Sequence, residues 1–294
     1  MKKVRVAGWF SFESMGASAG DLMTRDLACE WLRLADCPYD VALAPPFAGG
    51  VEWPKVDPRN YCHVIFVCGP FGNGWPITEF LQYFSCCRMI GLNLSMLDPL
   101  DGWNPFDRLW ERDSSVRARP DLAFLSRQPL VPIAGLVLID TQPEYGKKDS
   151  HEHANEALRN LAAQRGAAVV NIDTRLDTNT TGLSTSAQIE SLIARMDVVL
   201  TTRLHGTVLA IKNGVPALAV DSVVGGGKIL RQTESIGWPC VLPVESITDE
   251  ALQRAFSYCL TSEARDKAKD CASRARERIE QVRMEFIEAL AHRG

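Results

Sequence analysis

The stretch "DVVLTTRLHGTVLAIKNGVPALAVD", residues 197–221, predicts a strand, a helix and a second strand in direct succession. Its first apolar run is typical of a buried strand. The apolar helix that follows is expected to end at Gly214, before a second apolar run that ends at Asp221. Strands joined through a helix usually pair in parallel, because the helix carries the chain back across the sheet. The stretch therefore predicts an α/β fold built on a parallel sheet.

The same alternation of strands and helices occurs on both sides of "LSRQPLVPIAG", residues 125–135, whose two prolines and weak periodicity predict a linker between two domains. Residues 248–294 are almost entirely helical in pattern. One predicted helix carries, at helical spacing, the apolar residues Met23, Leu27, Trp31 and Leu34. The other expected strands cover residues 4–10, 39–44, 62–69, 89–95, 135–140 and 167–173.

Composition and charge narrow the range of partners. The net charge of -4 comes from 32 basic and 36 acidic residues spread along 294 positions, which disfavours nucleic-acid binding and a polybasic membrane contact. Nine cysteines occur without a paired framework, which favours a reducing compartment. The chain has neither a signal-peptide pattern nor a long uncharged apolar run, so we expect a soluble, cytoplasmic protein with small ligands.

The junction between the strand and the helix of residues 197–221 carries the strongest functional signal. In a parallel sheet, ligands collect where strands end and helices begin. Arg203 offers a planar fork for a carboxylate or phosphate, and His205 can bind an anion or move a proton. Gly206 allows close backbone approach, and Thr207 is expected to begin the helix; both are candidate substrate-binding residues. The alternative is that Arg203 pairs with a surface carboxylate and His205 satisfies a loop carbonyl.

A lysine follows the next predicted strand, in "VVGGGKIL", residues 223–230. This loop is not a P-loop, because Ser222 and Ile229 occupy positions that the motif reserves for other residues. Lys228 would lie on a flexible loop near Arg203 and could bind the same ligand; the alternative is a solvated surface lysine.

Two glycine-bearing loops of the first half, residues 10–21 and 69–76, follow predicted strands. Gly20, Gly69 and Gly72 are candidate ligand-binding positions there, although such loops usually serve tight turns. Asp21 is a candidate base, with a helix cap as the alternative. We expect no metal site, because the histidine pair at residues 151 and 153 lacks a third ligand at metal-site spacing.

Together these residues resemble the signature of the polysaccharide pyruvyl transferase family. The residues that match its pattern most specifically are Arg203, Leu204, His205, Gly214, Pro216 and Lys228. Fainter similarities are Gly20-Asp21, "IFVCGPFGNG" (65–74), "WERDSSV" (110–116) and "RPDLAFL" (119–125). The chain departs from the family at residues 69–72, which read Gly-Pro-Phe-Gly in place of consecutive glycines, and in the short link between its last two segments.

The resemblance implies two Rossmann-like domains whose parallel sheets face a cleft, as in GT-B glycosyltransferases, plus C-terminal helices. Residues 1–130 would form the N-terminal domain on the acceptor side. Residues 131–260 would form the C-terminal domain on the donor side. Residues 261–294 would form a C-terminal helix that crosses back to the first domain. The apolar stripe of this helix would pack against that domain.

The resemblance also implies a reaction, the transfer of the pyruvyl group of phosphoenolpyruvate onto two hydroxyls of a sugar or polysaccharide unit as a cyclic ketal. Arg203 would bind the donor's carboxylate or phosphate, and His205 would deliver a proton or assist phosphate departure. Lys228 would stabilise donor charge, and Asp21 is a candidate base. No cofactor is implied beyond the donor substrate, and the role would lie in exopolysaccharide and cell-envelope synthesis. A peripheral membrane contact through a lipid-linked acceptor stays open.

Two other functions remain as alternatives. A GT-B glycosyltransferase that uses a nucleotide sugar commonly holds the donor ribose with an acidic residue, and only Asp221 and Glu234 are available between Arg203 and Gly237. A non-catalytic protein that binds small anions or glycans is the second alternative.

Overall fold

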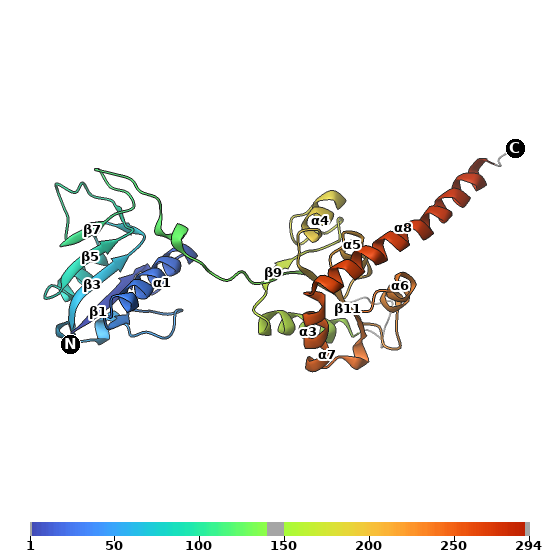
Figure 1. The fold of residues 1–294 in the computed structure, drawn as a ribbon, viewed down its shortest axis with the longest axis horizontal. Helices are drawn as coiled ribbons and strands as arrows, with labels where there is room; N and C mark the ends of the chain where they lie inside the picture. Colours follow the sequence, from blue (N-terminus) through green and yellow to red (C-terminus); the bar gives the residue numbers. More distant parts are fainter. Residues whose placement is uncertain (1, 140–149, 292–294) are drawn as a thin grey trace. The chain divides into compact units, whose positions relative to one another are not determined.

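The computed structural model describes residues 2–139 and 150–291. Contacts divide the chain into two units, residues 1–128 and residues 129–294, and the division falls inside the segment expected as a linker. In each unit, the described residues form a five-stranded sheet whose neighbouring strands are all parallel, with helices packed beside it (Figure 1). The expected α/β class with two parallel sheets is therefore confirmed.

The sheet of the first unit has the order β2-β1-β3-β5-β7, and a short pair, β4-β6, stands beside it. Its strands are β1 (Lys3–Gly8), β2 (Tyr39–Val41), β3 (Tyr61–Val67), β4 (Pro70–Phe71), β5 (Arg88–Leu92), β6 (Ser95–Met96) and β7 (Arg108–Trp110). The helices are α1 (Ala19–Leu34) and α2 (Ile77–Tyr83), with 3-10 turns η1 (Trp9–Ser11), η2 (Trp53–Lys55), η3 (Pro58–Asn60) and η4 (Leu122–Leu125).

The sheet of the second unit has the order β12-β11-β10-β8-β9. Its strands are β8 (Ile133–Val137), β9 (Ala168–Asn171), β10 (Val198–Thr201), β11 (Ala217–Asp221) and β12 (Val241–Pro243). Its helices are α3 (His151–Gln164), α4 (Ser186–Ile193), α5 (Leu204–Lys212), α6 (Lys228–Ile236), α7 (Asp249–Cys259) and α8 (Ser262–Ala291), with the turn η6 (Val244–Ser246). The expected strand at 135–140 ends in Asp140, which lies outside the described residues.

Local signals placed several of these elements correctly, and others less well. Thr185 and Gln188 have capping-box spacing in the sequence, which predicts a helix start there, and they form that capping box at the start of α4. Strands β7 and β12 were not expected from the sequence, because both are three-residue edge strands. The expected apolar face of α1 is partly wrong: Leu27 is buried, but Trp31 is 38% and Leu34 is 79% exposed. The side of α1 that covers the sheet instead carries small and branched residues, namely Thr24, Ala28, Cys29 and Leu32.

In each sheet the chain adds its second strand on one side of the first strand and the later strands on the other side, so the strand order reverses at one point. In the first unit the chain passes from β1 outward to β2, and from β3 toward β5 on the other side. In the second unit it passes from β8 outward to β9, and from β10 toward β11 on the other side. Loops that leave neighbouring strands in opposite directions open a crevice at the carboxyl ends of those strands, where ligands bind in open α/β sheets.

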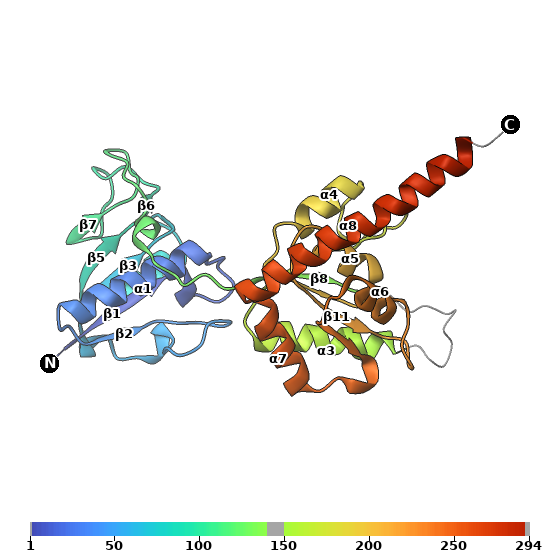
Figure 2. The same ribbon diagram turned by 45° about the vertical axis from the view of Figure 1, so that its right-hand side comes forward.

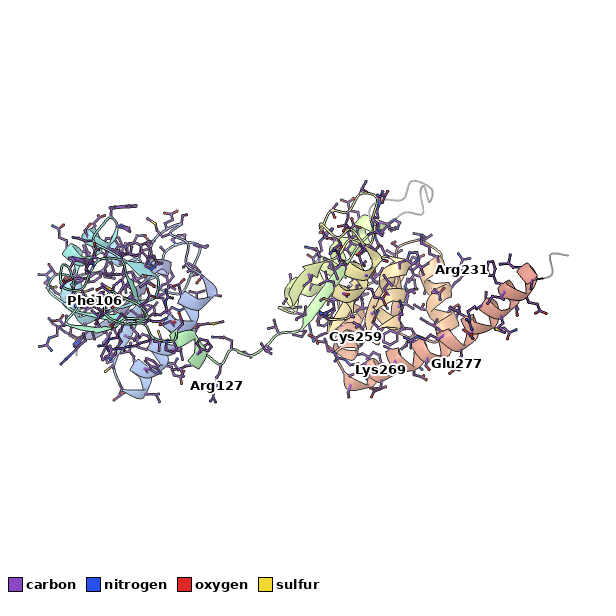
Figure 3. The ribbon with its side chains drawn as sticks, turned by 90° about the horizontal axis from the view of Figure 1, so that it is seen from above. Phe106, Arg127, Arg231, Cys259, Lys269 and Glu277 are labelled. Carbon is purple, nitrogen blue, oxygen red and sulfur yellow. The ribbon has the colours of Figure 1, made fainter. Side chains whose placement is uncertain are left out.

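The long C-terminal helix α8 packs within its own unit through its first half. Ala264, Ala268, Cys271 and Ala272 are buried, and α8 contacts α5, α6 and α7. Its second half extends past those helices (Figures 1 and 2), where Ile279, Val282, Phe286 and Leu290 are exposed. Lys269 and Glu277 mark the charged outer surface of α8 (Figure 3). A return of α8 to the first unit stays a prediction. Among the helices of the described ranges, none is both long and apolar enough to span a membrane.

The loop after β3, where the chain departs from the family's glycines, is tied to the first unit's core by Phe71. This side chain is fully buried. The centroid of its ring lies 4.9 Å from that of Phe66 and 4.7 Å from that of Phe106. The ring also stacks on Trp103, with 5.7 Å between the centroids. Figure 3 shows Phe106 among the side chains of this unit. Phe71 thus anchors this segment to the core through three aromatic rings.

We expect Phe71→Ala to lower the free energy of unfolding by about 3–5 kcal/mol, because it leaves a cavity among three aromatic rings. Phe124→Ala is the matched control, since that side chain is 85% exposed and its removal should cost less than about 0.5 kcal/mol. Urea unfolding of both variants measures the difference. Equal losses would contradict the anchoring role of Phe71.

Candidate functional site

The backbone at the end of β10 is fixed by buried threonine hydroxyls. The Thr201 hydroxyl donates to the carbonyl of Val137 at 2.7 Å and accepts from the backbone N–H of Arg203 at 2.9 Å. Helix α5 begins at Leu204 with Arg203 as its N-cap residue. The expectation that Thr207 begins the helix is therefore wrong, because the helix can start as soon as the Thr201 hydroxyl has turned the chain.

A second set of hydrogen bonds joins the ends of β8 and β10 to α3. The Thr202 hydroxyl donates to Oδ1 of Asn155 at 2.8 Å, and Nδ2 of Asn155 donates to the carbonyl of Ile139 at 2.8 Å. The backbone N–H of Ile139 donates to the Thr202 hydroxyl at 3.0 Å, which closes the ring. Thr202 and Asn155 are both buried. The crevice between the two strand ends therefore has a rigid floor.

The side chain of Arg203 lies over the ends of β8 and β9. Its Nε donates to the carbonyl of Leu138 at 2.7 Å, and its Nη2 lies 3.7 Å from Oδ1 of Asp173. The two side chains are only 12% and 11% exposed. Arg203 does pair with a carboxylate, as the alternative interpretation held, but that carboxylate belongs to a nearly buried site and not to the surface.

Asp173 is held by the loop that follows β9. Oδ1 accepts from the backbone N–H of Arg175 at 2.9 Å, and Oδ2 accepts from the backbone N–H of Thr180 at 3.1 Å. Burial acts to raise the pKa of Asp173, but these N–H donors and the charge of Arg203 outweigh burial, and the pKa lies below its ordinary value. Asp173 is therefore ionised at neutral pH and holds the guanidinium in one orientation.

A polar pocket of about 190 Å³ opens beside this ion pair. Its polar lining comprises Arg159, Asn171, Asp173, Thr180, Thr181 and Arg203. Sequence reasoning missed all of these except Arg203. A signal existed for Asp173, a charged residue directly after a predicted strand, whereas Arg159 reads as an ordinary exposed position of α3.

His205 does not join Arg203 in this pocket. It is the second residue of α5 and is exposed, and it is not among the residues that line the pocket. Its position is still relevant to an anion, because the first turn of a helix presents backbone N–H groups without intrahelical partners and a partial positive charge. Arg203 and His205 thus flank the start of α5, with the guanidinium on the side of β8 and β9.

Gly206 and Thr207 serve the fold at this junction. A Cβ at Gly206 would lie 2.3 Å from Oγ1 of Thr201 and 2.9 Å from Cγ1 of Val137, so the close approach is to the chain's own strands. Thr207 is fully buried, and its hydroxyl donates to the carbonyl of Arg203 at 3.3 Å. Both residues were expected to contact the substrate. Substrate contact by either residue stays a prediction, and their observed contacts are internal.

Lys228 stands on the same edge of the sheet, after β11. It is the first residue of α6, so the expectation of a flexible loop is wrong at this position. The cause is Asp221, whose buried Oδ2 accepts from the backbone N–H groups of Gly227 and Leu230, each at 2.9 Å. The carboxylate of Asp221 organises the start of α6 in this way and thereby positions the exposed Lys228.

The candidate residues of the first unit have separate roles. Oδ2 of Asp21 accepts from the backbone N–H of Ser18 at 2.7 Å and from its hydroxyl at 2.6 Å, so Asp21 caps α1. Gly20 lies in the first turn of the same helix, where a Cβ would meet no atom closer than the Ser18 hydroxyl at 3.7 Å. Gly69 and Gly72 lie together on the loop after β3, and Gly69 has a φ of +76°, a conformation that favours glycine.

The two central segments noted for their family resemblance meet at Arg112. Its Nε lies 3.0 Å from Oδ2 of Asp113, and its Nη1 lies 2.9 Å from Oδ2 of Asp121. The Ser95 hydroxyl contacts both Arg112 and Asp113. Hydrogen bonding to Asp121 raises the pKa of Arg112, and hydrogen bonding from Ser95 lowers the pKa of Asp113. The short link between the segments is thus closed by an ion-pair network.

These segments, with Arg203 and His205, lie inside one continuous match to a known family. Residues 108–222 match the family model of polysaccharide pyruvyl transferase. The resemblance is confirmed over this range, which contains Arg112, Arg203 and His205 and ends before Lys228.

A comparison with curated proteins finds no significant match. Among solved structures, spinosyn forosaminyltransferase SpnP is 12% identical, with 96% of this chain and 99% of that chain covered and a TM-score of 0.36. Spinosyn rhamnosyltransferase SpnG is 13% identical, with coverages of 86% and 74% and a TM-score of 0.37. UDP-GlcNAc 2-epimerase from Methanocaldococcus jannaschii is 9% identical, with coverages of 95% and 100% and a TM-score of 0.33. The α/β class of both units follows from their all-parallel five-stranded sheets.

We expect Gly206→Ala to destabilise the protein by about 1–3 kcal/mol, because the added methyl group overlaps the Thr201 hydroxyl. Gly20→Ala is the matched control, another glycine in the first turn of a helix. Its added methyl group meets no atom closer than the Ser18 hydroxyl at 3.7 Å, and it should stabilise α1 by about 0.5–1 kcal/mol. Denaturant unfolding measures both changes, and a loss of stability in Gly20→Ala alone would contradict this account of the junction.

The Asp173 ion pair predicts a specific pH dependence. The folded-state pKa lies below the unfolded value of about 3.9, so the carboxylate stabilises the fold above that value and stops doing so as pH falls through the folded pKa. We expect the difference in unfolding temperature between the wild type and Asp173→Asn to be constant from about pH 7 to pH 5 and to shrink below about pH 4. Calorimetry measures it, and a difference unchanged at about pH 3 would contradict the ion pair.

Proposed function

We propose that this protein is a transferase that moves the pyruvyl group of phosphoenolpyruvate onto two hydroxyls of a glycan and forms a cyclic ketal. The observation that carries the proposal is the fixed, nearly buried Arg203, in the segment that matches the family and at the crevice where the second sheet changes direction. The match supports a transferase that acts on polysaccharide. The donor and the ketal product are our inference.

The charge of the donor fits the groups at this edge of the sheet. Phosphoenolpyruvate carries a carboxylate and a phosphate, which call for clustered cations and helix N-termini. Arg203 and Arg159 line one pocket, and Arg203 has N–H donors beyond its contacts with Leu138 and Asp173. The first turn of α5 and the exposed Lys228 supply further positive charge on the same edge. We propose that these groups stabilise the donor without a metal or another cofactor.

The reaction can be written with all atoms balanced. A proton adds to the methylene carbon of the donor, and the first sugar hydroxyl attacks the resulting cation and loses its proton to a base. The bond between carbon and the phosphate oxygen then breaks, and the second hydroxyl closes the ring on the new cation. The two sugar hydroxyls lose two protons in total. One equals the proton taken up by the new methyl group, and the other is carried away on hydrogen phosphate. The reaction therefore needs a proton donor, a base and stabilisation of the leaving phosphate.

We propose that Arg203 binds the donor's carboxylate or phosphate. His205, exposed at the start of α5, would then deliver the proton or assist phosphate departure, and Lys228 would stabilise donor charge. Gly206 and Thr207 would contribute by holding the start of α5 in place. The base stays unassigned: Asp21 remains a candidate, although its carboxylate caps α1.

The remaining expectations follow from this assignment. We propose that the second unit binds the donor and that the first unit, with Gly20 in the first turn of α1 and Gly69 and Gly72 on the loop after β3, binds the glycan acceptor. We place the reaction in the cytoplasm, in the synthesis of exopolysaccharide or cell-envelope glycans, with no nucleic-acid partner.

The nucleotide-sugar alternative is weakened by the positions of the two acidic residues available to it. Both oxygens of Asp221 accept hydrogen bonds from backbone N–H groups, so the buried carboxylate has no role left for a ribose. Glu234 lies six residues after Lys228 on α6, about 9 Å along the helix away from the carboxyl edge of the sheet. Neither residue is positioned to hold a nucleotide there.

A binding experiment tests the donor assignment. Phosphoenolpyruvate should raise the unfolding temperature, because a ligand of the folded state stabilises it, whereas UDP and GDP sugars should not. Arg203→Ala should weaken phosphoenolpyruvate binding by roughly tenfold to a hundredfold, the loss expected for a charge-assisted hydrogen bond. Arg195→Ala is the control. Arg195 is exposed and lies between α4 and the start of β10, at the end of that strand opposite to Arg203. Unchanged binding in Arg203→Ala, or stabilisation by the nucleotide sugars alone, would refute the assignment.

A further inference from the structure

A second pocket lies at the crevice of the first unit. It has a volume of about 370 Å³, and its lining residues are Trp9, Pro70, Gly72, Asn73, Gly74, Trp75, Ile77, Leu97 and Asp98. Trp9 follows β1, residues 70–77 follow β3, and residues 97–98 follow β5 and β6. The pocket therefore collects the loops at the carboxyl ends of three neighbouring strands, at the point where the order of the first sheet changes direction.

Two indole rings wall this pocket, one fixed and one open. Nε1 of Trp9 donates to the carbonyl of Pro70 at 3.0 Å. The indole ring packs against the rings of Phe12 and Phe66, with centroid distances of 5.8 and 6.3 Å. A Cβ at Gly69 would lie 2.2 Å from Cδ1 of Trp9, so glycine is what lets the ring lie on the loop. Trp75 is 74% exposed. An exposed indole beside a fixed one is an apolar surface open to a ligand.

A carboxylate lies at the same pocket. Oδ2 of Asp98 accepts from the backbone N–H of Asn73 at 2.8 Å, which fixes the side chain against the loop. The side chain is half-exposed, and within the described residues Oδ1 accepts no hydrogen bond. The pocket thus combines aromatic surface with a fixed, negatively charged hydrogen-bond acceptor.

This combination matches the two kinds of surface that a sugar ring presents. A pyranose ring presents C–H groups on one face, which pack on an indole, and hydroxyl groups at its edge, which donate to a carboxylate. A wholly apolar ligand would bury Oδ1 of Asp98 without a hydrogen-bond donor, which is costly. An anion would be repelled by Asp98. We infer that the pocket bounded by Trp9, Trp75 and Asp98 binds a sugar ring by stacking on Trp75 and by hydrogen bonding to Asp98.

The inference rests on the proposed function in one respect, the identification of this sugar as part of the glycan acceptor. The site itself stands on the geometry of the first unit. Residues 69–72, at which the chain departs from the family's glycines, form part of the wall of this pocket. Phe71 anchors that loop, and a Cβ at Gly72 would lie 3.3 Å from Oδ2 of Asp98. Acceptor preference would thus differ from that of other family members at this loop.

Saturation-transfer NMR and calorimetric titration of the full chain with methyl pyranosides of common hexoses and N-acetylhexosamines, without phosphoenolpyruvate, test the site. We expect at least one of them to bind, with saturation concentrated on the protons of one ring face. Trp75→Ala should weaken this binding by about tenfold or more. Asp98→Asn, which keeps the acceptor for the Asn73 N–H but loses the charge, should weaken it less.

Trp110→Ala is the matched control. Trp110 is another exposed tryptophan of the first unit, at 49%, and it lines a different pocket beside α1. Its loss should leave sugar affinity unchanged. No binding by any of the pyranosides, or equal weakening in Trp75→Ala and Trp110→Ala, would overturn the inference.

The two proposals can fail separately. Sugar binding at Trp75 without stabilisation by phosphoenolpyruvate would leave the sugar site in place and overturn the pyruvyl transfer. Stabilisation by phosphoenolpyruvate that depends on Arg203, with no sugar binding that depends on Trp75, would overturn only the sugar site.

Discussion

The candidate site depends on how the guanidinium of Arg203 is held at the end of β10. The Leu138 carbonyl and the ionised Asp173 fix the side chain, and the buried hydroxyls of Thr201 and Thr202 fix the backbone beneath it. A nearly buried guanidinium needs such partners, because an unpaired buried charge is strongly unfavourable. The same partners preorganise the guanidinium for an anion, because the entropy cost of ordering the side chain does not have to be met when a ligand binds.

Much of the fold follows from local sequence signals. Residues 197–221 form the expected strand, helix and strand, and the capping residues Thr185 and Thr248 begin α4 and α7, because each of these features depends on neighbours in sequence. The start of α5 was placed too late, because the hydrogen bond that turns the chain there comes from Thr201.

The partners of the site depend on contacts between distant parts of the chain. Asp173 and Arg159 line one pocket with Arg203 only because β9 pairs with β8 and α3 contacts β10 in the folded unit, and no local pattern carries that information. His205, two residues from Arg203, falls outside the pocket for a local reason, because the start of a helix turns successive side chains in different directions. The glycine-bearing loops of the first unit could be located from the sequence, but their neighbours could not. The tryptophans near these loops indicate a ligand pocket only in the folded unit, where the ends of three strands lie together.

The central claim is pyruvyl transfer from phosphoenolpyruvate to a glycan, and its most direct measurement follows both products of one reaction. The protein is incubated with phosphoenolpyruvate and a panel of candidate glycans, and phosphate release is compared with the mass gain of each acceptor. The account predicts one phosphate released for each ketal formed, and loss of both in Arg203→Ala. Phosphate release without any change in acceptor mass, or full turnover in Arg203→Ala, would contradict it.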